Sequence, residues 1–217
     1  ADRIVLLGSN VRHELPLLHA RLRKAQTKNG ARIFAVNPVD FDFAFSLAGK
    51  QIVAPSRFAE ALASAELRSA VQGGGNTVLI VGGIAENHPQ AAAIRAAARD
   101  FAAATGARLC RIPQGANAVG LSRAGMLPAG KDVATMLAQP RKAYVLYGIE
   151  PGLDFADSAA ARKALAGGKV VAFSQFACAS TRDVADVILP IGALPEIDAT
   201  LTNLDGRKQQ ARAGGKL

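Results

Sequence analysis

Tryptophan is absent from this sequence, and cysteine, methionine and tyrosine are scarce, with two residues of each. The two cysteines, Cys110 and Cys178, lie far apart and neither belongs to a Cys-x-x-Cys pair. The sequence therefore argues against a disulfide and against a cysteine-ligated cluster within these residues. A reducing compartment is the expectation that follows from such sparse cysteine use.

Long apolar runs are also absent, and none approaches the length that a membrane-spanning helix needs. The chain begins Ala1-Asp2-Arg3 and enters an expected strand at once, without the pattern of a secretory leader. An opening that lacks methionine indicates a segment of a longer protein.

Several motifs of catalysis and nucleotide binding are missing from the sequence. It contains no GxxxxGK[ST], no GxGxxG and no G-x-S-x-G. The three histidines, His13, His19 and His88, fall in different expected elements without the spacing of metal ligands. The sequence therefore predicts no catalytic residue and no metal ligand.

Half of the residues are apolar, and alanine, valine, isoleucine and leucine dominate them. Short apolar strands alternate with Ala-rich helical patterns, which predicts an α/β fold of parallel sheets flanked by helices. The Gly-rich run Gln72–Asn76 is the best candidate linker. We therefore expect a first lobe over residues 1–72 and a second over residues 76–217.

The expected elements follow one another closely. Strands are predicted at 3–7, 32–36, 77–81, 108–111, 143–147, 169–173 and 187–190, and helices at 16–28, from Ser56 past Ala65, 87–105 and 158–165. The stretch 114–131 is rich in Gly, Asn and Pro, which predicts a long ordered loop.

Glycine follows three of the expected strands: Gly8, with Ser9 and Asn10 after it, then Gly82, and then Gly148. Open α/β folds bind ligands at the carboxyl ends of their strands, so these loops could line one crevice. The alternative is that each glycine only permits a tight turn with positive φ.

The net charge is +9. Basic residues concentrate between Arg12 and Arg32 and in the tail after Asp205. A solvated helix face, or a surface that docks onto acidic neighbours or anionic lipid heads, explains them. Aromatic residues do not interleave with them and no nucleic-acid motif is visible, so nucleic acid is not expected as a partner.

The run Phe176–Gln209 holds the most informative polar residues. Ser180 and Thr181 either bind phosphate at a helix start or only cap that helix. Asp183 and Asp186 are either paired acids, or a helix-start residue and a turn cap. The residues alone leave these alternatives open.

This run resembles the end of the core domain in the molybdopterin oxidoreductase family, with its Ala-Asp-Val-Ile-Leu-Pro and Asn…Gly-Arg motifs. Four further segments resemble family motifs: Gly8–Asn10, Ala35–Pro38, Gln114–Pro128 and Tyr147–Pro151. The resemblance implies Rossmann-like lobes, as in the formate dehydrogenase and DMSO reductase core. It also implies a pterin cofactor in most members, and places Gly8, Ser9, Asn10, Gly148, Thr181 and Asn203 near it.

Within the family, the segments Asn37–Phe43 and Gly120–Pro128 most resemble the iron–sulfur electron-transfer subunits of bacterial NADH-quinone oxidoreductase, respiratory complex I. That resemblance implies a cofactor-free structural and docking domain, with molybdopterin not expected. It implies iron–sulfur (4Fe-4S) clusters in a segment outside this sequence, which pass electrons from NADH toward quinone in a proton-translocating complex. It also implies the other subunits as partners, and a peripheral location on the cytoplasmic face of the inner membrane.

The sequence departs from the family pattern where Ala199 replaces a glycine and Asp205 replaces a glutamate. An alanine is costly where the backbone needs a positive φ to approach a ligand. Both departures favour the cofactor-free branch. The alternative is a molybdopterin-binding segment of a formate dehydrogenase-like enzyme.

Overall fold

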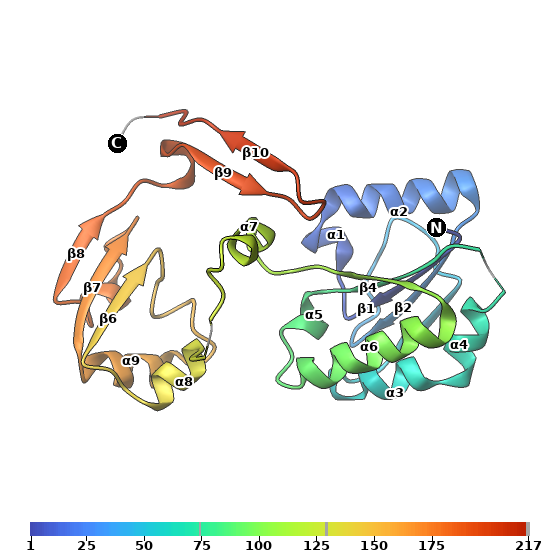
Figure 1. The fold of residues 1–217 in the computed structure, drawn as a ribbon, viewed down its shortest axis with the longest axis horizontal. Coiled ribbons are helices and arrows are strands. Elements are labelled where there is room, and N and C mark those ends of the chain that lie inside the picture. Colours follow the sequence, from blue (N-terminus) through green and yellow to red (C-terminus); the bar gives the residue numbers. More distant parts are fainter. Residues whose placement is uncertain (74, 129, 216–217) are drawn as a thin grey trace. The chain divides into compact units, whose positions relative to one another are not determined.

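The computed structural model describes residues 1–73, 75–128 and 130–215, and these form two compact units (Figure 1). Unit 1 comprises Ala1–Gly115 and unit 2 comprises Ala116–Leu217. Each unit is built on a parallel sheet, as the alternation of short apolar strands and helices predicts.

Unit 1 contains a five-stranded sheet in the order β3-β2-β1-β4-β5, in which every neighbouring pair is parallel. The strands are β1 (Arg3–Leu7), β2 (Arg32–Asn37), β3 (Gly49–Ile52), β4 (Thr77–Val81) and β5 (Arg108–Arg111). The strand order changes direction between β1 and β4, which makes this point the topological switch of a doubly wound sheet.

Helices cover both faces of this sheet (Figure 1). They are α1 (Val11–Glu14), α2 (Pro16–Asn29), α3 (Phe58–Ala63), α4 (Ala65–Val71), α5 (Gly83–Glu86) and α6 (Ala91–Thr105), with a short 3₁₀ helix η1 (Pro55–Arg57) before α3. Along β1, Ile4 and Leu6 pack with α1 and α2, while Val5 and Leu7 pack with α3, α4 and α6. The period of two along each strand thus divides the core into two layers.

Unit 2 contains a three-stranded parallel sheet in the order β6-β7-β8 and a separate antiparallel hairpin, β9-β10. Its elements are α7 (Ala118–Arg123), α8 (Val133–Ala138), β6 (Ala143–Tyr147), α9 (Ser158–Ala166), β7 (Lys169–Ser174), α10 (Ala179–Arg182), β8 (Val187–Pro190), η2 (Leu194–Glu196), β9 (Ala199–Thr202) and β10 (Lys208–Ala211). Its core is small, with Leu146, Leu165, Val170 and Ala172 as the buried members of its cluster.

The α/β fold with parallel sheets flanked by helices is confirmed, and the expected strands coincide with β1, β2 and β4 to β8 within a residue. Two predicted helix ends are also confirmed. Gly30 and Gly106, with φ of 65° and 67°, terminate α2 and α6.

Four local predictions differ from the structure. The helix expected at 87–105 begins at Ala91, and Asn87 is instead the C-cap of α5. The helix expected to start at Ser56 is divided into α3 and α4, because Ser64 leaves the helical conformation and its hydroxyl caps α4 through Leu67 N. Ser56 itself lies within η1. The expected loop 114–131 contains the short helix α7.

The lobe boundary also lies elsewhere than the sequence places it. Strand β4 follows the candidate linker 72–76, yet it pairs with β1 in the same sheet. The linker therefore joins elements of one sheet, and the compact units divide between Gly115 and Ala116. Gly74, inside that linker, lies outside the described residues.

Candidate functional site at the carboxyl edges of the sheets

The loops after β1 and β4 approach each other closely at the switch point of unit 1. Gly8 has a φ of 56°, and a Cβ on it would lie 2.8 Å from atoms of Ala85 and Phe58. Gly82 has an extended backbone with φ of −98°, and a Cβ there would overlap Ser9. The positive φ expected after the strand is thus found at Gly8 and not at Gly82, and both positions need glycine because of packing.

Ser9 and Asn37 lock the ends of β1 and β2 together. Both residues are fully buried. Ser9 N donates to Asn37 Oδ1 at 2.8 Å, and Asn37 Nδ2 donates to Ser9 O at 3.2 Å. The amide of Asn37 therefore satisfies backbone groups that a ligand in the crevice would otherwise bind.

The carboxylate of Glu14 binds the remaining donors of this edge. It accepts hydrogen bonds from Ser9 Oγ at 3.0 Å, from Asn10 N at 2.9 Å and from Gly83 N at 3.2 Å. The last of these donors is the first residue of α5, where a negative charge is favourable. One internal anion thus joins the loop after β1 to the loop after β4.

These contacts test whether Gly8, Ser9 and Asn10 fit the phosphates of a pterin dinucleotide. The hydroxyl of Ser9 and the amide of Asn10 already bind a carboxylate, and a phosphate in the same place would meet that negative charge. As arranged, these residues do not fit a phosphate group. Asn10 Oδ1 is buried without a hydrogen-bond partner among the described residues, and it is an acceptor, which a phosphate oxygen cannot satisfy.

Gly148 occupies the corresponding position at the end of β6 in unit 2. Its φ is 63°, as expected for a tight turn after a strand, and its N–H continues the ladder to Phe173 O at 2.8 Å. A Cβ on Gly148 would have no described atom within 4 Å. The space beside this backbone is therefore open, unlike the space beside Gly8.

Thr181 is fully buried in the short helix α10, and its hydroxyl lies 2.9 Å from Cys178 Sγ. The N-cap of α10 is Cys178, without a side-chain cap hydrogen bond. Ser180 Oγ also lies near this sulfur, at 3.5 Å. The expected capping by Ser180 or Thr181 is therefore wrong, and the buried hydroxyl of Thr181 faces the protein interior.

Asp183 and Asp186 are not a catalytic pair. Asp183 is the C-cap of α10, at the opposite end from the one expected. Asp186 accepts from Val170 N at 2.7 Å and from Lys169 Nζ at 3.0 Å. The hydrogen bond from Val170 N, followed by the one from Lys169, holds the pKa of Asp186 below its ordinary value. It therefore fastens the start of β7.

Asn203 shapes the turn of the hairpin β9-β10. Its Oδ1 accepts from Arg207 N at 2.9 Å, and its carbonyl accepts from Gly206 N at 2.9 Å. Ala199 lies at the start of β9, and no described non-glycine residue has a positive φ. Alanine is therefore accommodated at 199 without backbone strain.

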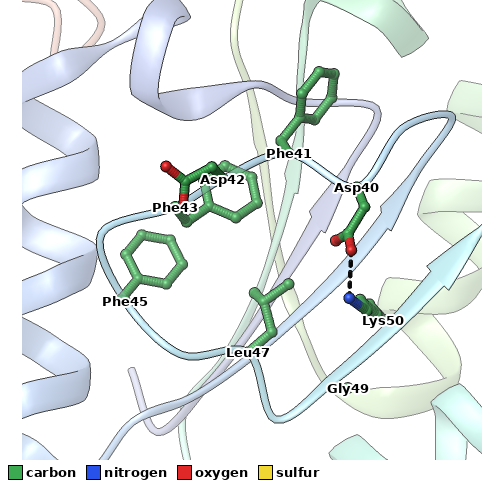
Figure 2. A pocket seen from close by; sticks show the side chains of 8 residues that line it. All are labelled: Asp40, Phe41, Asp42, Phe43, Phe45, Leu47, Gly49 and Lys50. Atoms are coloured by element: carbon green, nitrogen blue, oxygen red, sulfur yellow. Dashed lines mark hydrogen bonds and ion pairs between the residues drawn. The ribbon is translucent and has the colours of Figure 1, made fainter.

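A cavity of about 570 Å³ lies in the loop between β2 and β3 of unit 1 (Figure 2). The rings of Phe43 and Phe45 stack with centroids 5.2 Å apart. The buried ring of His19 packs against both, and its Nε2 accepts from Ala44 N at 3.2 Å. Burial first, and then the nearby Arg12, lower the pKa of His19, so a neutral imidazole holds the loop on α2.

The acids at the rim of this cavity are already paired. Asp40 Oδ2 lies 2.5 Å from Lys50 Nζ, and Asp42 Oδ2 lies 2.9 Å from Arg12 Nη1. The cavity therefore offers an apolar floor and neutralised charges, which is a packing arrangement and no reactive centre.

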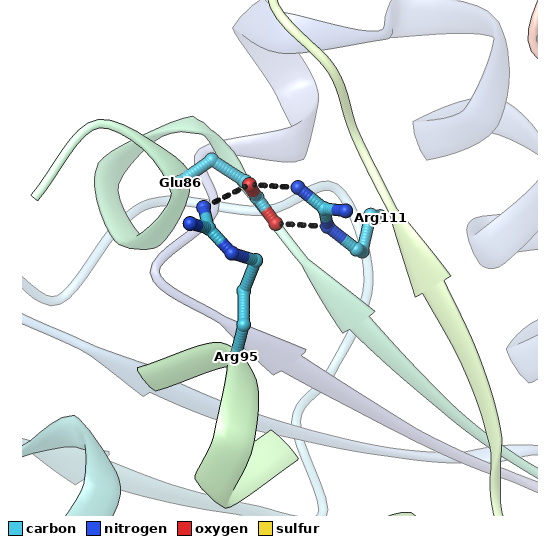
Figure 3. A network of polar contacts seen from close by, with 3 residues as sticks. All are labelled: Glu86, Arg95 and Arg111. Atoms are coloured by element: carbon cyan, nitrogen blue, oxygen red, sulfur yellow. Dashed lines mark hydrogen bonds and ion pairs between the residues drawn. The ribbon is translucent and has the colours of Figure 1, made fainter. Parts of the chain in front are cut away.

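A second polar cluster ties α5, α6 and β5 together (Figure 3). The Glu86 carboxylate binds Arg111 through two hydrogen bonds of 2.6 Å, and Arg95 at 3.2 Å. Burial alone would raise the pKa of Glu86, but Arg111 and then Arg95 outweigh it and hold that pKa below its ordinary value. The carboxylate is thus ionised and structural.

Sequence reasoning missed Glu14 and Glu86. The signal for Glu14 was an acidic residue in the helical turn that follows the glycine loop. Glu86 gave no signal, because Arg111 lies 25 residues away along the sequence. Over residues 1–73, 75–128 and 130–215, no group of three His, Cys, Asp or Glu side chains is arranged to hold a metal ion.

The family model described as molybdopterin oxidoreductase matches residues 1–216. The chain therefore belongs to the molybdopterin oxidoreductase family, and the resemblance of its motifs to that family is confirmed.

Among the solved structures of similar fold is one that matches the whole chain. It is a chain of the formyltransferase/hydrolase complex (FhcABCD) from Methylorubrum extorquens, solved by X-ray crystallography in complex with methylofuran. The TM-score is 0.57 and the identity 15%, and the match covers 100% of this chain and 70% of that one. At this identity the likeness concerns the fold alone. None of the helices in the described parts of this chain is long and apolar enough to cross a membrane.

Proposed function

We propose that this chain is a cofactor-free structural and docking domain of the iron–sulfur electron-transfer subunit of an NADH-quinone oxidoreductase. The iron–sulfur clusters lie in another segment of that subunit and carry electrons from NADH toward quinone. The domain itself turns over no substrate and binds the neighbouring subunits at the cytoplasmic face of the inner membrane.

The observation that carries this proposal is the internal closure of the switch-point crevice. Glu14 and Asn37 take the donors that Ser9, Asn10 and Gly83 direct toward it. In doubly wound sheets this crevice is where ligands bind. A carboxylate fixed there is incompatible with a phosphate at the same donors, because the two negative charges repel each other.

The test is metal and pterin analysis of the full protein, purified from its own cells with its partner subunits. Molybdenum and tungsten are expected to be far below one atom per chain, while iron is present in cluster amounts. Oxidation of the sample is expected to release no fluorescent pterin. Stoichiometric molybdenum or tungsten together with pterin would overturn the proposal.

The second candidate is a molybdopterin-binding segment of a formate dehydrogenase-like enzyme. The open space beside Gly148 at the end of β6 favours it, because a ligand could approach that backbone. The same metal analysis separates the two functions. In the second case, a Gly148→Val variant should lose molybdenum and pterin, whereas in the first case its metal content is unchanged.

A further inference from the structure

The three-stranded sheet of unit 2 has helices on one face only. The residues of that covered face alternate along the strands and pack with α9 or with the segment after α10. They are Tyr144, Leu146, Val170, Ala172 and Ile188. The intervening residues point to the opposite face of the sheet.

The opposite face is apolar and exposed. We call it the open face, and its residues are Val145, Tyr147, Val171, Phe173, Val187 and Leu189. Val145 and Tyr147 are each 69% exposed, and Val187 and Leu189 are 47% and 40% exposed. Parallel sheets normally bury both faces, so a contiguous apolar surface of this kind marks an interaction site.

The topology of unit 2 explains why its own helices leave this face bare. The strands follow one another in one direction, β6-β7-β8, and right-handed crossovers then place α9 and α10 on the same side. Helix α8 packs beside α9. The segment that leaves β8 forms the hairpin β9-β10 and no crossover helix. Helix α7 packs on β9. The described helices of unit 2 thus pack elsewhere and leave the open face uncovered.

The size of the open face favours a helix as its occupant. Strand spacing and rise give three strands of five residues an area of roughly 14 by 17 Å. A helix with its side chains is about 10 Å wide, so one or two helices would cover it. A stable interface between two globular copies needs about 800 Å² from each, which is several times more. A second copy of this chain is therefore a poor fit.

Basic residues line the rim of the open face at the amino ends of its strands. Lys142 is exposed there, and the side chain of Lys169 is 81% exposed but already forms an ion pair with Asp186 at 3.0 Å, so Lys142 carries the charge argument. The whole chain carries a net charge of +9. An occupant with acidic residues at this end would match the rim, and charge complementarity would set its direction on the sheet.

From these observations we infer that the open face docks an amphipathic helix of a partner subunit, with its apolar stripe on Val145, Tyr147 and Phe173 and acidic residues beside Lys142. This inference rests on the proposed docking function and names the surface that performs it. The partner layer completes the two-sided burial that a parallel sheet requires.

A photo-crosslinker at the centre of the face tests this directly. Tyr147 is replaced by p-benzoylphenylalanine in the full protein, the assembled complex is irradiated, and the crosslinks are mapped by mass spectrometry. We expect crosslinks to a different subunit, in an apolar helical segment flanked by acidic residues. Crosslinks confined to the same polypeptide, crosslinks to a second copy, or no crosslink would each overturn the inference.

Charge insertion gives an independent measurement. Tyr147→Glu should reduce the amount of the crosslinked subunit that co-purifies with the complex by at least about tenfold, which equals about 1.4 kcal/mol. Leu153→Glu is the matched control, because Leu153 is 77% exposed in unit 2 and lies outside the sheet. Equal loss in both variants would contradict the inference. Both side chains are exposed, so the melting temperatures should stay unchanged.

Crosslinking and metal analysis together test the docking face and the cofactor-free function separately. Stoichiometric molybdenum with the crosslink to the partner intact would overturn the proposed function and leave the docking face supported. If molybdenum and tungsten are far below one atom per chain but the crosslinks stay inside the polypeptide, the docking face is overturned and the proposed function remains supported.

Discussion

The two units contain similar parallel sheets, yet they differ in how these sheets are buried. In unit 1, one cluster covers each face, and β1 is buried along most of its length. In unit 2, one cluster covers one face, and Val145 and Tyr147 lie exposed on the other. The difference follows from strand order, because a sheet that grows in both directions from β1 receives crossovers on both faces. Unit 1 is complete as a layered structure, whereas unit 2 presents a surface.

The same contrast holds at the carboxyl edges of the sheets. Packing encloses Gly8, and hydrogen bonds to Glu14 and Asn37 hold the loop that follows it. Gly148 has open space beside it. A mutation therefore has a different cost at equivalent positions of the two units, and the following measurements exploit that.

The largest effect is expected in the core of unit 1. Phe58 is fully buried against the loop after β1, so Phe58→Ala should destabilise unit 1 by about 4 kcal/mol. Hydrogen exchange resolved by peptide should show loss of protection in unit 1 and little change in unit 2. Phe176→Ala, at a residue that is 69% exposed, is the control with little effect. Equal loss in both units would contradict their separate cores.

A matched pair of glycine substitutions compares the two carboxyl edges. Both positions have a positive φ, which costs an alanine about 1 kcal/mol. In Gly8→Ala the new Cβ also overlaps Phe58 and Ala85, so we expect a total destabilisation of about 3 kcal/mol at that position. Denaturant titrations of Gly8→Ala and Gly148→Ala measure the difference. Similar costs at both positions would show that the edge of unit 1 is no more tightly packed.

Glu86→Gln should weaken unit 1 by about 2 kcal/mol, because it leaves two guanidinium groups without their carboxylate. This value is below that for a fully buried pair, since the side chain of Arg111 is 52% exposed. Thermal melts measure it, with Glu60→Gln as an exposed ion-pair control that should leave stability unchanged.

The Glu86 carboxylate also makes the stability of unit 1 depend on pH in the acid range. The folded-state pKa of Glu86 is lowered, so its stabilisation is full above the unfolded pKa of about 4.5 and is lost as the pH falls through the folded value. Melting temperatures of the wild type and Glu86→Gln should converge in that range. If the melting temperatures of the two proteins differ by the same amount at every pH down to acid unfolding, Glu86 is not the source of the pH dependence.

Protonation of His19 should produce a smaller pH dependence of the stability of unit 1 near neutral pH. Its folded pKa is lowered from 6.5, so its contribution is full above 6.5 and declines as the pH falls toward the folded value. Protonation removes the acceptor for Ala44 N and charges a ring packed on Phe43 and Phe45. Nuclear magnetic resonance titration of His19 measures the pKa. A pKa for His19 at or above 6.5 would contradict a buried, neutral imidazole.

The smallest effect is expected on the open face. Val145→Ala should change the stability of the isolated chain by less than about 0.5 kcal/mol, because the side chain is already in water. Val5→Ala, at a fully buried residue in the middle of β1, should cost about 2 kcal/mol or more. A large cost at Val145 would show that the face is covered even without a partner.

Sequence patterns predicted the regular elements well. Apolar runs followed by glycine located β1, β4 and β6, and Gly30 and Gly106 located the ends of α2 and α6. The candidate site was predicted less well. Gly8, Ser9 and Asn10 do lie at a sheet edge, but Thr181 and Asn203 serve internal contacts. Their partners, Cys178 and Arg207, are only three and four residues away, so the residue types alone did not distinguish these internal contacts from ligand binding. Glu86 was missed for another reason, because its partner Arg111 lies 25 residues away along the sequence.

Short-range sequence patterns were sufficient to specify the α/β class, the positions of the strands and the turns after them, because hydrophobic period and glycine conformation act over a few residues. The family motifs were also visible at that level. Three features emerged only in the folded chain: β4 returns beside β1, Glu14 closes the switch-point crevice, and one face of the sheet in unit 2 stays bare. Strand order and crossover direction set these features, and they depend on contacts between residues that are distant in the sequence.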